Sequence, residues 1–191
     1  MGATRLPGKV LLKVKDKSLL AWEIERIKQA TMIDRIVIAT TTNGKDDAIE
    51  SFAKSVGIDC CRGSEDDVLD RYFGCSLAYK GYETIVRITG DCPLIDPVII
   101  DKVIGLHQSN NTDYTSNIIK ETFPDGMDVE VFSRVALERS AKEASLTSER
   151  EHVTLHMRND DTFSKSNLAS PVDYSRYRLT VDEKEDFAVI S

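Results

Sequence analysis

The sequence predicts an α/β fold in which a mostly parallel sheet is covered by helices on both faces. Short β-branched runs alternate with helical stretches of ten or more residues through the first half of the chain. The helical stretches carry apolar residues at helical spacing, and several begin or end at typical capping residues. No linker, repeat or low-complexity segment interrupts the 191 residues, so we expect one domain over residues 1–191.

The first half of the chain supplies helices and strands in turn. Ser18 is a suitable N-cap for a helix over residues 18–30, and Gly57 closes a second helix over residues 46–57. The other elements are the strands DRIVIAT (34–40), IDCCRG (58–63) and ETIVRITG (83–90) and the helix EDDVLDRYFGCSLAY (65–79). In such sheets ligands bind beyond the carboxyl ends of the strands, so the loops that follow strands are the candidate sites.

The second half of the chain is less regular. Pro97 opens a helix over residues 97–108, and Ser133 caps another over residues 133–145. Between these helices lie extended TDYTSN (112–117), the loop KETFPDGM (120–127) and strand-like DVEVF (128–132). SERE at 148–151 fits a capping box, and residues 176–187 run from a strand through a loop into a helix.

Composition excludes several classes of function. Lys and Arg number 25 against 32 Asp and Glu, and no basic block is present, so no nucleic-acid partner is expected. No apolar run approaches the roughly 20 residues of a membrane-spanning helix, so we expect no membrane association and a cytoplasmic location. The four cysteines form no CxxC pair and are expected to be reduced thiols without chemistry: Cys60, Cys61, Cys75 and Cys92.

The opening stretch MGATRLPGK suits a loop that holds phosphate groups. Its glycines, Gly2 among them, allow close backbone approach, and its cations Arg5 and Lys9 suit phosphate oxygens. It is not a Walker P-loop, because Ala3 and Val10 stand where that motif needs glycine and a hydroxyl residue. The alternative for this stretch is a flexible terminal tail.

Two acidic residues follow predicted strands. Asp91 lies in TGDCPLID, directly after the strand that contains ETIVRI, and Asp182 lies in LTVDEKEDF. One carboxylate rarely holds Mg²⁺ alone, whereas two from different strand ends together with nucleotide phosphates would do so. Pairing Asp91 with Asp182 therefore predicts a magnesium site, and the alternative for Asp91 is a turn carboxylate that caps the helix after Pro97.

Two further motifs have structural alternatives. HVTLH spaces His152 and His156 as in a zinc helix, but Val153 stands where the general-base glutamate belongs, so a zinc hydrolase is not expected. GSEDDVLDRY follows a strand and opens a helix, and most of its acids suit capping and the helix dipole. Arg71, one turn beyond Asp67 on the same face, is not explained by capping.

Six motifs occur in an order that resembles one family: TRLPGK, GSEDDVLDRY, RITGDCPLID, TSN followed by PDGMDVEVF, SEREHVT and YRLTVD. They are similar to those of the SpsF-type spore-coat polysaccharide biosynthesis proteins. These belong to the wider group of cytidylyltransferases that activate sugar acids such as KDO and sialic acid. The resemblance covers essentially the whole chain. It implies the nucleotide-diphospho-sugar transferase fold, a Rossmann-like three-layer α/β/α sandwich with a mixed, mostly parallel sheet and one reversed strand.

The resemblance also implies a reaction and a site. A sugar hydroxyl attacks the α-phosphorus of CTP and displaces pyrophosphate, which leaves a CMP-sugar, with Mg²⁺ as the cofactor. The implied catalytic residues are Arg5, Lys9 and Asp91, and the implied metal ligands are Asp91 and Asp182. The implied nucleotide-binding residues are Gly2, Arg5, Lys9, Ser64, Asp67, Arg71 and Arg87. The implied contacts to the acceptor sugar are Asn117, Asp128, Glu130, Arg150 and His152.

Several points stay open at the level of sequence. Relatives carry an apolar first strand before the opening loop and run beyond position 191, so we expect this chain to lack a central strand and the family's C-terminal end. Residues 120–132 occupy the place of a dimerisation arm in related enzymes, so we expect a homodimer. The alternatives are a nucleotidyltransferase that uses another NTP and a sugar phosphate, and a non-catalytic protein that binds nucleotide sugars.

Overall fold

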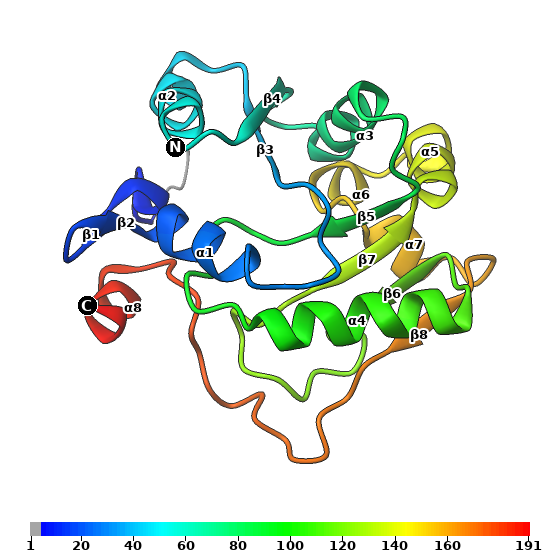
Figure 1. Ribbon diagram of the computed structural model, residues 1–191. Helices are drawn as coiled ribbons and strands as arrows, with labels where there is room; N and C mark the ends of the chain where they lie inside the picture. Colours follow the sequence, from blue (N-terminus) through cyan, green and yellow to red (C-terminus); the bar gives the residue numbers. More distant parts are fainter. Residues whose placement is uncertain (1–4) are drawn as a thin grey trace.

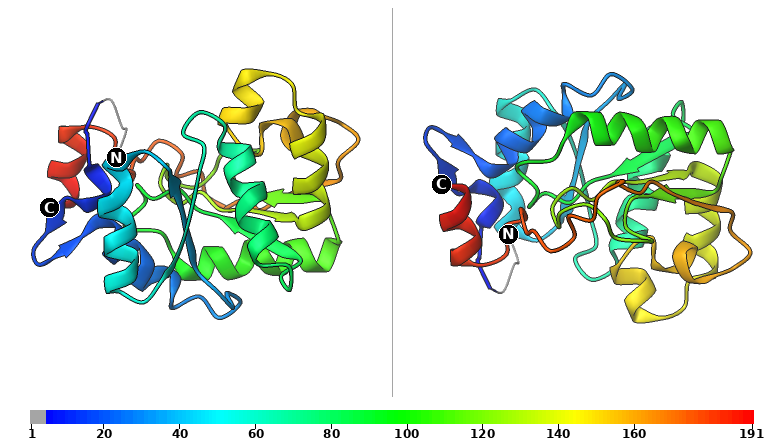
Figure 2. Two further views of the ribbon diagram at one scale, coloured as in Figure 1. Left: turned by 90° about the horizontal axis from the view of Figure 1, so that it is seen from above. Right: turned by 90° about the horizontal axis from the view of Figure 1, so that it is seen from below.

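The computed structural model describes residues 5–191, which form a sandwich of helices, strands and helices (Figures 1 and 2). One outer layer contains α1 (Leu19–Ile27), α2 (Asp47–Ser55) and α4 (Pro97–Asn110). The other contains α3 (Val68–Ala78), α5 (Arg134–Glu143), α6 (Thr147–Glu151) and α7 (Leu155–Asn159). The three-layer α/β/α fold predicted from the sequence is confirmed.

The strands of the middle layer are divided between two main sheets. In the first, β3 (Val37–Thr41) and β4 (Asp59–Gly63) pair in parallel. The second has the order β5-β7-β6-β8 and contains β5 (Thr84–Arg87), β6 (Tyr114–Ser116), β7 (Glu130–Ser133) and β8 (Lys165–Asn167). β7 is antiparallel to both of its neighbours, so it is the reversed strand of a mixed sheet. Within residues 5–191 no strand joins β3 to β5.

Short elements at the two ends of the described chain lie side by side (Figure 1). The 3-10 helix η1 (Lys9–Leu11) leads into a small hairpin of β1 (Lys13–Val14) and β2 (Lys17–Ser18). Helix α8 (Lys184–Ile190) packs there through Phe187 and Ile190 around buried Leu6 and Leu19. The strand predicted before α8 is wrong, since residues 176–182 form only an isolated bridge between Asp125 and Arg178. These residues bind neighbouring loops through single backbone contacts instead of a ladder.

Most predicted helix starts are confirmed by their caps. The hydroxyl of Ser18 accepts a hydrogen bond from the Ala21 amide at 3.2 Å, and that of Ser133 accepts one from the Ala136 amide at 3.0 Å. The capping box predicted at Ser148 is wrong, because α6 begins at Thr147 and its N-cap is Leu146, two residues before Ser148. Glu149 still caps this turn by accepting the Leu146 amide at 3.3 Å.

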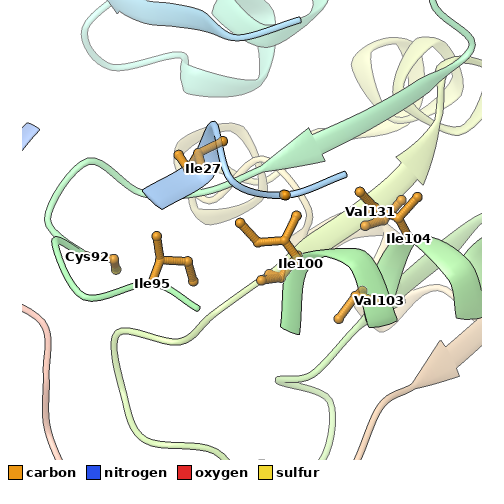
Figure 3. Packing of buried hydrophobic residues seen from close by; sticks show 9 residues of the cluster. Ile27, Cys92, Ile95, Ile100, Val103, Ile104 and Val131 are labelled. Atoms are coloured by element: carbon orange, nitrogen blue, oxygen red, sulfur yellow. The ribbon is translucent and has the colours of Figure 1, made fainter. Parts of the chain in front are cut away.

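Side chains on the two faces of β7 pack into two separate hydrophobic clusters. Val131 points toward α1 and α4, where it packs in a cluster that includes Ile100 and Ile104 (Figure 3). Phe132, the next residue, packs with Leu69 and Leu137 of the opposite layer. This alternation follows from the two-residue period of a strand covered on both faces. All four cysteines are free thiols, as predicted, and Cys92 belongs to the first cluster.

Candidate functional site

Two carboxylates from distant parts of the chain converge on the ammonium group of Lys9. The Lys9 Nζ atom lies 2.7 Å from Asp91 Oδ2 and 2.6 Å from Asp182 Oδ1. Burial disfavours the charge of Lys9, but hydrogen bonds to Asp182 and Asp91 outweigh that effect and raise its pKa. Burial also opposes the charge of Asp182, whose pKa is nevertheless lowered, chiefly by Lys9. The structure thus brings together the two acids that the sequence paired.

Local backbone structure places these three side chains. Gly8 has a φ of 72°, the left-handed conformation that favours glycine, and it turns the chain into η1 at Lys9. Asp91 lies four residues beyond the end of β5. The Asp91 carbonyl accepts hydrogen bonds from the Val181 amide at 2.9 Å and from the Thr180 hydroxyl at 3.1 Å. These two hydrogen bonds fix residues 180 and 181 against Asp91, and Asp182 follows them directly in the chain.

Two arginines add positive charge around Asp182. Arg5 lies 3.4 Å from Asp182 and 3.0 Å from Glu183, and its side chain is 60% exposed. Arg178 pairs with Asp182, Asp125 and Asp186. Arg5, expected to bind the triphosphate, thus lies beside one of the two acids, Asp182. Arg178 was not predicted from the sequence. Its position four residues before Asp182 is the signal that could have found it.

Further carboxyls stand near this cluster. Burial raises the pKa of Asp128 to about 6, and the charges of Asp125 and Glu130 add to the effect. Burial likewise raises the pKa of Asp125 against the influence of Arg178, and the charges of Asp182 and Asp91 contribute. Asp125 therefore experiences the charges of Asp91 and Asp182, whereas Asp128 experiences that of Asp125 but of neither of those two acids. Perturbed carboxyl groups of this kind are common at functional sites.

A second group of predicted residues meets at the start of α3. Asp67 accepts the Asp70 amide at 2.9 Å as the N-cap and accepts Arg150 Nε and Nη2 at 2.8 and 2.6 Å. The Ser64 hydroxyl accepts the Asp67 amide at 3.0 Å, and Arg71 donates to the Ser64 carbonyl. Residues predicted to bind the nucleotide and one predicted to bind the sugar thus contact each other. No contact in the described part of the chain links them to Lys9.

Other predicted site residues are bound inside the protein. Glu130 is 2% exposed, pairs with Arg87 and accepts the Tyr114 hydroxyl at 2.7 Å. Asn117 is 1% exposed, donates to the Met127 carbonyl at 2.7 Å and accepts the Val129 amide at 2.8 Å. These partners favour structural roles for Asn117, Glu130 and Arg87 over direct ligand contacts.

The remaining predicted residues lie at the periphery or outside the described chain. His152 ends α6 and is exposed, whereas His156 lies in α7, so the two histidines do not share one helix. Gly2 lies outside the described residues.

One cluster of possible metal ligands was not predicted. Atoms of Glu143, His156 and Asp160 lie within 4.8 Å of one another. Arg139 already pairs with Glu143 at 2.9 Å and with Asp160 at 3.6 Å. Because this arginine neutralises both carboxylates, the cluster is adequately explained as a surface ion-pair group.

In Rossmann-like sandwiches ligands bind beyond the carboxyl ends of the strands, which is where Asp91 lies. A family model described as cytidylyltransferase matches residues 1–189. The spore coat polysaccharide biosynthesis protein SpsF of Bacillus subtilis is 35% identical over 198 residues, covering 100% of this chain and 81% of the relative. The chain belongs to the cytidylyltransferase family, a group of nucleotidyltransferases.

Solved structures agree with this assignment. A cytidylyltransferase from Leptospira borgpetersenii superposes with a TM-score of 0.94 at 37% identity, over 100% of this chain and 81% of its own. CMP:2-keto-3-deoxy-manno-octonic acid synthetase, solved in complex with CTP, superposes with a TM-score of 0.69 over 99% of this chain and 92% of its own. At 15% identity that second likeness shows a shared fold. None of the helices in residues 5–191 has the length and apolar character to cross a membrane.

Proposed function

We propose that this protein transfers CMP from CTP to a sugar acid and releases pyrophosphate, in the biosynthesis of a surface polysaccharide or glycan. The observation that carries the proposal is the Lys9 ammonium between Asp91 and Asp182, in a chain of the cytidylyltransferase family. The printed roles of two relatives support it, since one serves polysaccharide biosynthesis and the other is a CMP-sugar-acid synthetase complexed with CTP. We place the reaction in the cytoplasm.

The proposed reaction depends mainly on positioning the two substrates and on neutralising the charge of the phosphates. A hydroxyl oxygen of the acceptor forms a bond to the α-phosphorus of CTP, and the bond from that phosphorus to the leaving pyrophosphate oxygen breaks. Lys9 and Arg5 are cations that can bind the triphosphate, since both lie in the opening loop and one is strongly exposed. Asp128 and His152 would face the acceptor sugar, with Ser64, Asp67, Arg71 and Arg150 bordering the nucleotide.

We propose Mg²⁺ as the cofactor, held by Asp91 and Asp182. Both carboxylates approach one Nζ atom within 2.7 Å, so they are close enough together to share a cation. Oxygen donors fit a hard ion such as Mg²⁺. When bound, the ion would neutralise phosphate charge and polarise phosphoryl oxygens. Lys9, which now pairs with both acids, would then be free to bind phosphate.

The test is release of pyrophosphate from CTP and Mg²⁺ with a panel of sugar acids that includes KDO and sialic acid. Asp91→Asn should lower turnover at least about 100-fold with little change in CTP affinity, because it removes charge needed in the transition state. Asp161→Asn, at a fully exposed carboxylate, is the matched control and should leave turnover unchanged. Equal turnover in Asp91→Asn and the wild type would contradict the proposal.

The same assay separates the alternatives. Release of pyrophosphate from UTP, GTP or ATP with sugar phosphates, but not from CTP with sugar acids, would favour a nucleotidyltransferase that uses another NTP. Nucleotide binding without release in any combination would favour a non-catalytic binding protein.

We also propose that the protein is a homodimer. The proposal rests on the resemblance of residues 120–132 to the dimerisation arm of related enzymes. Of these residues, 130–132 belong to β7, and the loop before them packs on its own chain. The Asp125 amide donates to the Tyr177 carbonyl at 3.0 Å, and the Leu179 amide donates to the Asp125 carbonyl at 2.7 Å. Sedimentation at micromolar concentration that shows only monomer would refute the dimer.

A further inference from the structure

The guanidinium group of Arg178 binds three different carboxylates with three different nitrogen atoms. Nη1 donates to Asp125, Nη2 donates to Asp182, and Nε donates to Asp186 Oδ1 at 3.1 Å. Asp182 is one of the two acids proposed to hold Mg²⁺, whereas Asp125 and Asp186 have no part in that proposal. Arg178 therefore connects a proposed metal ligand to two carboxylates outside the metal site.

The two outer carboxylates are fixed by the backbone as well as by the guanidinium. Asp125, in the loop before β7, forms an isolated backbone bridge with Arg178. Asp186 lies in the first turn of α8, and its Oδ2 atom accepts the Asp182 amide at 2.8 Å. The segment that carries Arg178 leads into this helix (Figure 1). Arg178 is thus placed between two anchors that do not depend on its own side chain.

The two oxygens of the Asp182 carboxylate have different partners. Oδ1 accepts a hydrogen bond from Lys9 at 2.6 Å, whereas Oδ2 accepts one from Arg178. Arg5 lies farther from Oδ2, at 3.4 Å, and its side chain is 60% exposed. Under the proposed function Lys9 turns to phosphate when Mg²⁺ binds, so Arg178 is the close partner that Asp182 keeps.

We propose that Arg178 is the positioning residue of the magnesium site, because it orients Asp182 through Oδ2 while Asp125 and Asp186 fix its own guanidinium. This inference rests on the proposed function. The guanidinium is a rigid planar fork, whereas the lysine ammonium is a compact charge on a flexible stem. Three carboxylates bound by one side chain therefore require the shape of arginine as well as its charge.

The alternative is a group of surface ion pairs that adds only stability. The side chains of Arg178 and Asp125 are each 43% exposed, and ion pairs at such exposure contribute little to stability. A residue that orients a metal ligand has a different signature, since its substitution commonly lowers metal affinity by about 10–100-fold. The two roles therefore differ in which measured quantity changes.

The test compares the wild type with Arg178→Lys, which keeps the positive charge but loses the fork. Calorimetry measures the affinity for CTP with Mg²⁺ and with EDTA, and the ratio gives the gain in affinity that Mg²⁺ provides. In Arg178→Lys this gain should fall at least about tenfold, while the CTP affinity in EDTA should match the wild type. With Ca²⁺, which tolerates irregular coordination better than Mg²⁺, the gain should fall less than about threefold.

The matched control is Arg139→Lys on α5, because Arg139 is also a partly exposed arginine that pairs with two carboxylates, Glu143 and Asp160. This variant should bind CTP with wild-type affinity under all three conditions. The unfolding temperature of Arg178→Lys should lie within about 4 °C of the wild-type value, since water screens a side chain that is 43% exposed.

Three kinds of result would overturn the assignment of Arg178. A wild-type gain from Mg²⁺ in Arg178→Lys would show that charge alone suffices. Equal losses of CTP affinity with Mg²⁺, with Ca²⁺ and in EDTA, or a fall in unfolding temperature above about 10 °C, would show a structural role. A wild-type protein whose CTP affinity does not respond to Mg²⁺ would instead contradict the proposed magnesium site, and this inference with it.

Discussion

Glu23 of α1 is a buried carboxyl whose ionisation is disfavoured. It is 3% exposed, and its Oε2 atom has no partner. Burial raises its pKa well above the ordinary 4.5, and the charge of Asp91 adds to this shift. A carboxyl whose pKa is higher in the folded state than in the unfolded state binds more protons when folded. The free energy of unfolding must therefore fall as the pH rises above about 4.5.

Glu23→Gln should remove this pH dependence, because the amide keeps the shape of the side chain but does not ionise. Between pH 5 and 7 we expect the wild type to lose stability relative to the variant, by about 1.4 kcal/mol for each unit of pKa shift that is titrated. Urea unfolding at both pH values measures the difference. The control is Glu25→Gln, because Glu25 lies on the same helix as Glu23 but is exposed and pairs with Lys17. Parallel pH profiles for Glu23→Gln and the wild type would contradict the interpretation.

At the scale of elements, the start of α3 is joined to α6 by the Asp67–Arg150 pair. The side chains are 33% and 23% exposed, and Asp67 is also the N-cap of α3. A double-mutant cycle with Asp67→Asn, which keeps a capping oxygen, and Arg150→Met isolates the ion pair. We expect a coupling of about 1 kcal/mol in urea unfolding, smaller at high salt because water reaches both groups.

The exposed pair Arg139–Glu143 on α5 is the comparison for that cycle, with an expected coupling of about 0.5 kcal/mol or less. A coupling between Asp67 and Arg150 no larger than this would mean that the pair does not hold the two helices together.

The loop at Gly126 supports the segment that carries Asp182. Gly126 has a φ of 98°, and a Cβ atom there would lie 2.6 Å from the Thr180 amide nitrogen and 2.7 Å from the Leu179 carbonyl carbon. Gly126→Ala must therefore displace that segment, and we expect a loss of about 1–3 kcal/mol in urea unfolding together with lower turnover in the proposed transfer of CMP. Gly105→Ala in α4 meets no atom within 4 Å and should stabilise the protein by about 0.5–1 kcal/mol. Similar stability changes for the two variants would show that Gly126 carries no special constraint.

At the scale of the whole molecule, the sequence predicted the order of elements better than the interior of the site. Helical spacing and local caps such as Ser18 and Ser133 are visible in short stretches, so these helices were placed well. The pairing of Asp91 with Asp182 was predicted from their positions after expected strands, although in the structure only Asp91 follows one. The burial of Glu130 could not be predicted, because which neighbours enclose a side chain depends on tertiary packing between distant segments.

Elements without a strong local pattern were missed for a related reason. The hairpin of β1 and β2 and the short strand β8 have only two or three residues each, too few for periodicity to appear. Conversely, YRLTV has the β-branched and aromatic composition of a strand, but its backbone bonds only to the loops at Asp125 and Asp91. Strand composition without an available partner strand does not form a ladder.

The division of the middle layer predicts that the molecule does not open uniformly. β6 and β7 are paired on both sides, and Tyr114, Val131 and Phe132 are 0% exposed, so their amides should exchange only through global unfolding. β3 and β4 pair only with each other among the described strands, and β3 lines a cavity of about 710 Å³ between the two main sheets, so both strands should open at a lower free energy.

Hydrogen exchange of the protein alone, followed by mass spectrometry of peptides, measures this difference. Peptides that contain β3 and β4 should exchange at least about tenfold faster than those that contain β6 and β7, which corresponds to about 1.4 kcal/mol. Peptides from α4, whose Ile100 and Val103 are 0% exposed, provide the internal reference and should match β6 and β7. Equal protection of both sheets would show that the helices of the outer layers, which span the gap, couple the two sheets into one cooperative unit.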